Sequence, residues 1–76
     1  MFSDYQTELL KEKIKLMKLY KAENEFYRIK GLFIKGINVE EIVKTFQEEY
    51  DTTFNFKGTP KQLYKKIEQQ LTKKNS

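Results

Sequence analysis

The sequence predicts an all-α domain of three or four helices, and three observations support this. Apolar side chains recur every three or four residues along three stretches of the 76-residue chain, the spacing of a helix that buries one face. Each stretch begins at a residue that can cap a helix, Ser3, Asn38 or Thr59, with Gln or Glu three positions later. No repeat and no linker rich in Pro, Gly or Ser divides the chain, so residues 1–76 are expected to form one domain.

The first helical stretch covers residues 3–35, as one long or kinked helix or as two helices. Its first half carries an apolar stripe made of Leu9, Leu10, Ile14, Leu16, Met17 and Tyr20. No Gly or Pro interrupts residues 3–30, which favours a continuous or gently kinked helix. Asn24 provides the alternative, because it can cap a fresh helix that carries Phe26 and Phe33.

A second helix is predicted over residues 38–50. Gly36 suits the turn before it, since glycine tolerates a positive φ, and Asn38 can cap the first free amides. The apolar residues share one stripe, and the opposite face is acidic, with Glu40, Glu41, Glu48 and Glu49 toward solvent.

The last part of the chain combines an extended loop with a basic helix. Residues 51–58 are rich in Thr and aromatic residues, and we expect Phe54 and Phe56 to turn toward the core. Pro60 then occupies the first position of a helix over residues 59–72, where its missing N–H costs nothing.

Composition argues against most forms of catalysis. The chain has no Cys and no His, which excludes zinc fingers, thiol nucleophiles, imidazole bases and disulfide frameworks. Its three glycines form no phosphate-binding loop. The neighbouring acids Glu40/Glu41 and Glu48/Glu49 lie on a solvated helical face, whereas a catalytic pair of carboxylates needs a cleft that shifts their pKa values. We therefore expect a binding protein rather than an enzyme, with no metal or other cofactor. The absence of a signal peptide or an apolar stretch of ~20 residues predicts a cytoplasmic protein without a membrane partner.

Charge is distributed unevenly, with +3 over residues 1–36, −4 over residues 37–56 and +5 over residues 57–76. A capped helix N-terminus and lysines along one face both suit phosphate groups. The candidate nucleic-acid-binding residues are Lys57, Thr59, Lys61, Gln62, Lys65, Lys66, Gln69, Lys73 and Lys74. Within this set, Gln62 is expected to pair with a base edge. The expected ligand is DNA rather than RNA.

Three runs of residues resemble a known family. The runs FYRIKGLFIKG (26–36), VEEIV (39–43) and GTPKQLYKKI (58–67) are similar to the Myb/SANT-like group of helix-turn-helix domains, and the similarity extends over residues 24–72. The resemblance implies a helix-turn-helix-like unit whose third helix recognises DNA through Lys61, Gln62, Lys65 and Lys66. This chain lacks the family's tryptophans, so aromatic residues such as Phe26, Phe33, Phe46 and Tyr64 would take their place in the core. On this interpretation the protein is a regulatory or accessory factor of a phage or mobile element.

A protein-binding module, such as an inhibitor, adaptor or assembly factor, is the second interpretation. The acidic second helix would repel a phosphate backbone unless its glutamates face away. The long first helix also has more apolar surface than a three-helix core requires. Its stripe, Leu9, Leu10, Ile14, Leu16, Met17 and Tyr20, is therefore a candidate face for a homodimer or another protein, or packs as a fourth face of the core.

Overall fold

The computed structural model describes residues 4–74, except for the side chains of residues 23 and 72–74. The described chain forms four helices and no strand, which confirms the predicted all-α class. The helices are α1 (Asp4–Leu19), η1 (Glu23–Leu32), α2 (Val39–Tyr50) and α3 (Pro60–Lys74). The predicted cap at Ser3 lies outside the described residues.

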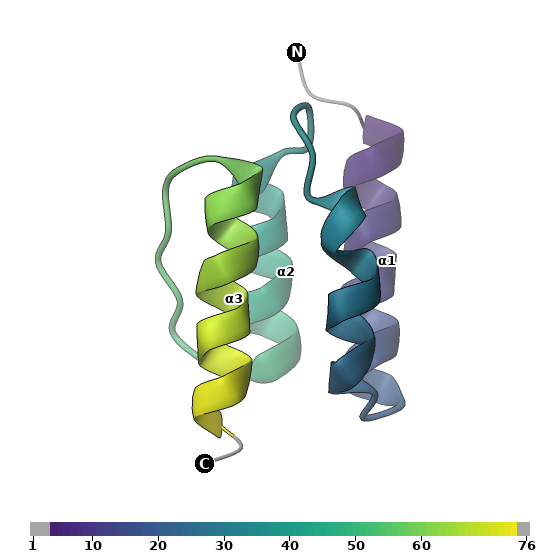
Figure 1. Cartoon of the computed structure of the whole chain (residues 1–76), viewed down its shortest axis with the longest axis vertical. Helices are drawn as coiled ribbons and strands as arrows, with labels where there is room; N and C mark the ends of the chain where they lie inside the picture. Colours follow the sequence, from purple (N-terminus) through teal and green to yellow (C-terminus); the bar gives the residue numbers. More distant parts are fainter. Residues whose placement is uncertain (1–3, 75–76) are drawn as a thin grey trace.

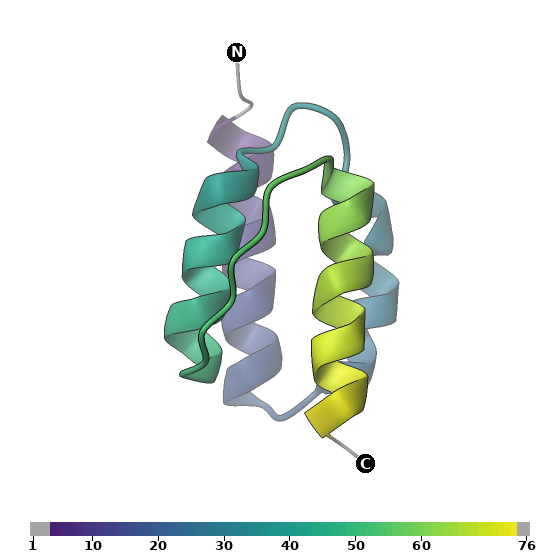
Figure 2. The same ribbon diagram turned by 90° about the vertical axis from the view of Figure 1, so that its left-hand side faces the viewer.

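The four helices run side by side, with each helix between two neighbours (Figures 1 and 2). Helices α1, α2 and α3 run in one direction and η1 runs in the opposite one. The α1–η1 pair forms one side of the bundle, η1–α3 the next, and α2 lies diagonally across from η1. Helix α2 is connected to α3 by an extended segment that returns along the bundle, whereas a helix-turn-helix pair uses a turn of three or four residues and a steep crossing.

Helix α1 ends at Leu19, so the favoured interpretation of a continuous helix over residues 3–35 is wrong. The Ala22 N–H donates to the Met17 carbonyl oxygen (2.9 Å) and the Lys21 N–H to the Lys18 carbonyl oxygen (3.3 Å). Lys21 lies in the left-handed region, with φ 54°. These bonds form a Schellman motif, which satisfies the last carbonyls of the helix and reverses the chain. The motif usually has glycine at the position of Lys21, so the sequence did not reveal it.

The segment after this turn is a 3₁₀ helix rather than an α-helix. The alternative of two helices is therefore confirmed. The second helix begins at Glu23, so the prediction that Asn24 caps it is wrong; the cap position is Ala22, without a side-chain hydrogen bond. Residues three apart eclipse one another in a 3₁₀ helix. Phe26 and Ile29 are accordingly both buried, with Leu32 packed against the same core. The apolar spacing of this segment therefore fits the three-residue period.

Helix α2 starts as predicted, because the Asn38 side-chain oxygen accepts the Glu41 N–H (3.3 Å). The Asn38 N–H in turn donates to the hydroxyl oxygen of Thr7, a buried residue of α1 (2.9 Å). This bond fixes the beginning of α2 to the first turns of α1. Helix α2 ends where Asp51 adopts the left-handed conformation, with φ 47°.

The extended segment before α3 lies along the seam between α2 and α3 (Figure 2). Phe54 is fully buried and its ring meets that of Phe46 edge-on at 5.0 Å, while Phe56 packs against the core from a partly exposed position. A side chain at Gly58 would place its Cβ 2.5 Å from the Gln62 Oε1 atom and 2.9 Å from the Phe56 ring. Glycine is therefore required by the close approach of α3.

Helix α3 begins with the predicted reciprocal cap. The Thr59 N–H donates to Gln62 Oε1 (3.0 Å), and the Gln62 N–H donates to Thr59 Oγ1 (3.2 Å). Leu63, Tyr64, Ile67 and Leu71 are buried, as the apolar stripe predicted. The helix is thus fixed both at its first turn and along one face.

We expect Lys21→Gly to raise the free energy of unfolding by about 0.5–1 kcal/mol, because a residue with a Cβ is strained in the left-handed region and glycine is not. Chemical denaturation of the two proteins measures the difference. As a control, Lys15→Gly in the exposed middle of α1 should lower the same quantity by about 1 kcal/mol. A loss of stability in both variants would contradict the assigned helix end.

Candidate nucleic-acid interface

An aromatic cluster joins η1 to α3. The Phe26 and Tyr64 rings are stacked almost in parallel, with centroids 4.4 Å apart and an interplanar angle of 4°. Phe33 meets both rings edge-on, at 5.7 Å from Phe26 and 5.3 Å from Tyr64. All three side chains are buried. Because they come from both helices, they fix which exposed residues of η1 lie beside which exposed residues of α3.

A groove of about 410 Å³ lies above this cluster, between η1 and α3. It is lined by Lys30, Gly31, Phe33, Ile34, Lys61, Tyr64, Lys65 and Glu68. Lys30 comes from η1, and its Nζ atom lies 5.6 Å from the centroid of the Tyr64 ring, whereas Lys61 and Lys65 come from α3. None of the ion pairs between described side chains uses these three lysines. The groove is therefore basic, with Glu68 as the acid among its lining residues.

Among the predicted residues of α3, two are part of the lining of this groove. Lys61 and Lys65 line the groove beside η1. Gln69 is exposed and Lys66 is half-buried, and neither is among the groove residues. Lys73 and Lys74 belong to α3, but their side chains lie outside the described part of the structure.

Thr59 and Gln62, which were predicted to bind DNA, cap the first turn of α3 in the structure. Gln62 Oε1 accepts the Thr59 N–H, which fills one of the two positions that a bidentate contact to adenine requires. Base pairing by Gln62 would therefore compete with the cap of α3. The sequence showed the capping pattern, but the prediction gave Gln62 both the cap and the contact to a base.

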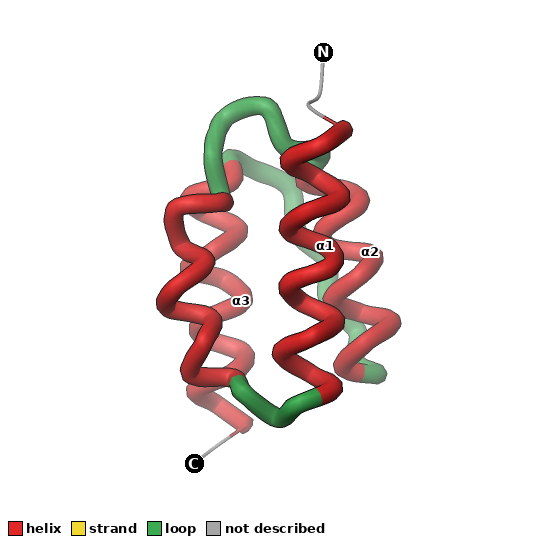
Figure 3. Tube along the Cα trace, turned by 90° about the vertical axis from the view of Figure 1, so that its right-hand side faces the viewer, coloured by secondary structure: helices red, strands yellow, loops and turns green. Residues whose placement is uncertain are grey.

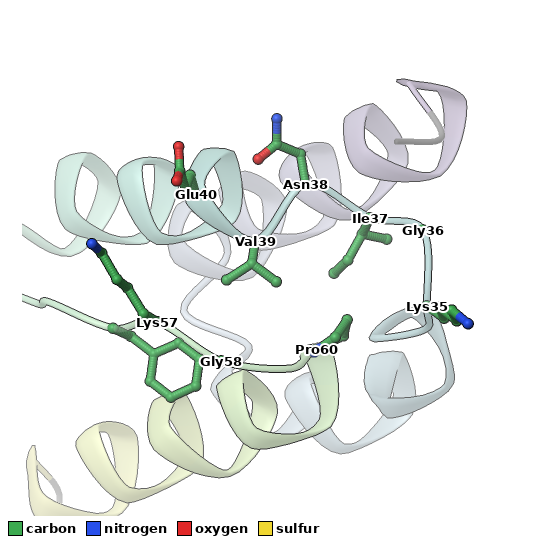
Figure 4. Close-up of a pocket in the computed structure, with 10 residues that line it drawn as sticks. Lys35, Gly36, Ile37, Asn38, Val39, Glu40, Lys57, Gly58 and Pro60 are labelled. Carbon is green, nitrogen blue, oxygen red and sulfur yellow. The ribbon is translucent and has the colours of Figure 1, made fainter. Parts of the chain in front are cut away.

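Lys57 lies in a different groove, of similar volume, formed where α2 and α3 begin. Ile37, Val39 and Pro60 point into this groove, and Lys35 points away from it (Figure 4). Glu40 lines the same groove as Lys57. The charges at this end are mixed, so Lys57 is separate from the basic groove between η1 and α3.

The acidic helix α2 does not line the basic groove. Glu41 is 3.6 Å from the Nζ atom of Lys11 on α1, which places it toward the α1 side of the bundle. Figure 1 shows α2 behind α3 when η1 and α3 are nearest the viewer. The repulsion expected between the second helix and phosphates therefore does not act directly at the groove.

Sequence reasoning missed the contribution of η1. Lys30 was not assigned to the site, nor was Tyr27, which is 59% exposed, or Ile34, which is 37% exposed. Tyr27 precedes Lys30 by three residues, so the two side chains lie on the same side of a 3₁₀ helix. The sequence signal for a 3₁₀ helix was the three-residue spacing of the apolar residues Phe26, Ile29 and Leu32.

The predicted partner face of α1 needs a correction. Leu10, Ile14 and Met17 are buried in the core, where they pack as a further face of the bundle. Leu16 and Tyr20 are exposed, at 40% and 73%, and Leu9 is half-buried. The six residues had been placed on one wide stripe, but the structure divides them between two faces.

Burial raises the pKa of the Tyr64 hydroxyl, and the nearby negative charge of Glu68 and the neighbouring Tyr27 act in the same direction. The hydroxyl therefore remains a neutral hydrogen-bonding group beside the groove at physiological pH. No negative charge from Tyr64 offsets the three lysines.

The chain matches no family model, no curated protein and no solved structure. Within residues 4–74, no helix has the length and apolar character needed to cross a bilayer. The same part of the chain contains no group of three or more acidic residues that could hold a metal ion.

Tyr64 should make the folded state sensitive to alkaline pH. Its folded pKa lies above the value of about 10 that applies to the unfolded chain, so its contribution to stability is complete below pH 10 and is lost as the pH rises further. Denaturant unfolding from neutral pH to pH 11 measures this loss. The Tyr64→Phe variant should lose less stability over this interval, and an unchanged pH dependence would show that Tyr64 is not responsible.

Proposed function

We propose that the chain binds DNA through phosphate contacts on the surface formed by η1 and α3. The observation that supports this most strongly is the convergence of Lys30 with Lys61 and Lys65 around one groove. These residues come from two helices far apart in the sequence. The aromatic contacts between Phe26 and Tyr64 hold them together without using the charged groups.

The electrostatics of this surface favour a polyanion. A lysine that contacts phosphate releases condensed counterions from DNA, so affinity falls as the salt concentration rises, with a slope of about 0.9 for each contact. Lys30, Lys61 and Lys65 are not neutralised by ion pairs among the described residues. No residue of α2 is among the residues that line this groove, and Glu41 of α2 pairs with Lys11 of α1.

The proposed contacts do not depend on the base sequence of the DNA. Lysine acts as a point charge toward phosphate, and Gln62, the residue predicted to contact a base, has its side-chain oxygen in the cap of α3. The Myb/SANT-like resemblance assigned recognition to α3 alone. The proposal retains Lys61 and Lys65 from that assignment and adds η1.

Tyr27 extends the surface toward unpaired bases. Its ring is 59% exposed and contacts the Phe26 ring edge-on at 6.3 Å, so it is supported on one side and open on the other. An exposed aromatic ring beside a lysine can stack on a base while the lysine contacts phosphate. This geometry favours single-stranded over duplex DNA.

A fluorescence anisotropy titration with single-stranded and duplex oligonucleotides at two salt concentrations tests the proposal. We expect Lys30→Ala, Lys61→Ala and Lys65→Ala each to weaken binding and to lower the salt slope by about one unit. Tyr27→Ala should weaken binding to the single strand more than binding to the duplex. Lys30→Ala is the most informative variant because it tests the contribution of η1.

Lys44→Ala is the matched control, since Lys44 is an exposed lysine on α2. It should leave both affinity and salt slope close to those of the unmodified protein. Absence of salt-dependent binding at micromolar protein would end the proposal. An unchanged salt slope for Lys30→Ala, together with a lowered slope for Lys66→Ala, would place the DNA on another face of α3.

The alternative of a protein-binding module is favoured by a different surface. Leu16 and Leu19 are exposed on α1, at 40% and 70%, and Tyr20, directly after its last residue, is 73% exposed. These side chains do not line the groove between η1 and α3. Pull-down of a stoichiometric protein partner that depends on α1 and not on Lys30 would support this second function.

A further inference from the structure

The outer face of α1 carries an apolar stripe in addition to the one that enters the core. Tyr5 is 77% exposed and Leu9 is half-buried near the start of the helix, and Leu16 and Tyr20 are exposed near its end. Figure 3 shows α1 and η1 side by side, with no other described helix in front of them. The exposed side chains at both ends of the stripe are thus accessible to a binding partner.

The residues of this stripe are arranged symmetrically about its midpoint. At 100° per residue, six positions of α1 and of the residue directly after it fall within an arc of about 100°, and the exposed Leu19 lies beside this arc. In chain order they are Tyr5, Leu9, Glu12, Lys13, Leu16 and Tyr20. An aromatic residue is followed by a leucine and an acid, and then by a base, a leucine and an aromatic residue. A second copy turned by 180° about the midpoint therefore meets this stripe with complementary groups.

We propose that two copies of the chain form an antiparallel dimer through this stripe, with a two-fold axis near the middle of α1. The alignment places Tyr5 opposite Tyr20 of the second copy and Leu9 opposite Leu16 of the second copy. Such an interface is isologous, because the same patch is used by both copies. This proposal is independent of the DNA-binding surface between η1 and α3.

The central charges determine the orientation. In the antiparallel pair, Glu12 of each copy lies beside Lys13 of the other, which gives two attractive contacts. In a parallel pair, the two Glu12 carboxylates would approach each other, and so would the two Lys13 ammonium groups. Like charges placed together disfavour the parallel arrangement. Antiparallel helices also bring opposite ends of their macrodipoles together.

The charges beside the stripe identify a second copy rather than a strongly charged partner. On the stripe and beside it, Glu8 and Glu12 precede the midpoint between residues 12 and 13, and Lys13 and Lys15 follow it. Glu8 also pairs with Lys11, at 3.3 Å. The surface is therefore neutral as a whole but polarised along the helix. Only a partner with the opposite order of charges fits it, and the chain itself, reversed, has that order.

A groove between α1 and η1 provides space for one of the tyrosines. It has a volume of about 440 Å³ and is lined by apolar side chains that include Leu16, Met17 and Tyr20, with Lys13 and Arg28 among its polar residues. The groove adjoins the Tyr20 end of the stripe. The antiparallel alignment brings Tyr5 of the second copy to this end, where its ring can enter the groove and its hydroxyl can reach solvent.

The size of the surface predicts a weak dimer. Tyrosine side chains bury about 150–250 Å² when fully covered, and Tyr5 and Tyr20 are each about three quarters exposed. With the leucines, the two copies together would bury on the order of 1,000 Å², at the low end of specific protein interfaces. We therefore expect a dissociation constant in the micromolar range or above.

Sedimentation equilibrium without nucleic acid, from micromolar to millimolar protein, tests the dimer. Glu12→Lys and Lys13→Glu should each weaken association about tenfold, since each converts two attractive contacts into repulsive ones. The double variant Glu12→Lys/Lys13→Glu restores opposite charges and should associate like the unmodified chain. Both residues are exposed, so circular dichroism should show the same helical content in all variants.

Two further variants separate the stripe from a general apolar effect. Leu16→Ser should abolish association, whereas Ile34→Ser should not, although the two side chains are exposed to nearly the same extent, 40% and 37%. Glu40→Lys on α2 repeats the charge change of Glu12→Lys away from the stripe and should leave the dimer intact. A chain that stays monomeric to millimolar concentration, or a double variant that is no better than either single one, would overturn the proposal.

Discussion

The stacked contact between Phe26 and Tyr64 is the interaction on which the arrangement of the molecule depends. Helix α2 is fixed to α1 through the hydrogen bond between Asn38 and Thr7, but α3 follows a long extended segment and needs its own attachment. The aromatic cluster provides it, because the Phe26 and Phe33 rings of the η1 region enclose Tyr64 of α3. Burial of large aromatic rings is among the most favourable terms available to a chain of this size. Without that contact, the lysines of η1 and α3 would not share a groove.

The sequence predicted the elements whose boundaries depend on local chemistry. Asn38 and Thr59 cap α2 and α3 through the same side-chain oxygens that their positions indicated. The end of α1 was missed because Lys21 adopts a conformation usually associated with glycine. Nothing in the local sequence marks that position, and the strain of about 1–2 kcal/mol is offset by burial of the residues on both sides of the turn.

The candidate DNA-binding surface was predicted only in part, since it is a property of two helices. Lys61 and Lys65 could be assigned from the exposed face of α3, but Lys30 acquires its position from the packing of η1. A single sequence does not show which exposed faces become neighbours. For the same reason, the sequence alone suggested that the glutamates of α2 would repel phosphates. In the structure α2 lies diagonally across from η1, away from the groove.

The 3₁₀ geometry of η1 explains how one short helix serves two surfaces. With three residues per turn, its side chains form three rows rather than a continuous spiral. The row containing Phe26 and Ile29 enters the core, the row with Tyr27 and Lys30 lies beside α3, and Arg28 belongs to the side that faces α1. A substitution in one exposed row leaves the other row in place. The proposed binding through the η1–α3 groove and the proposed association through the α1 stripe should therefore be separable by mutation, even though both surfaces border the same helix.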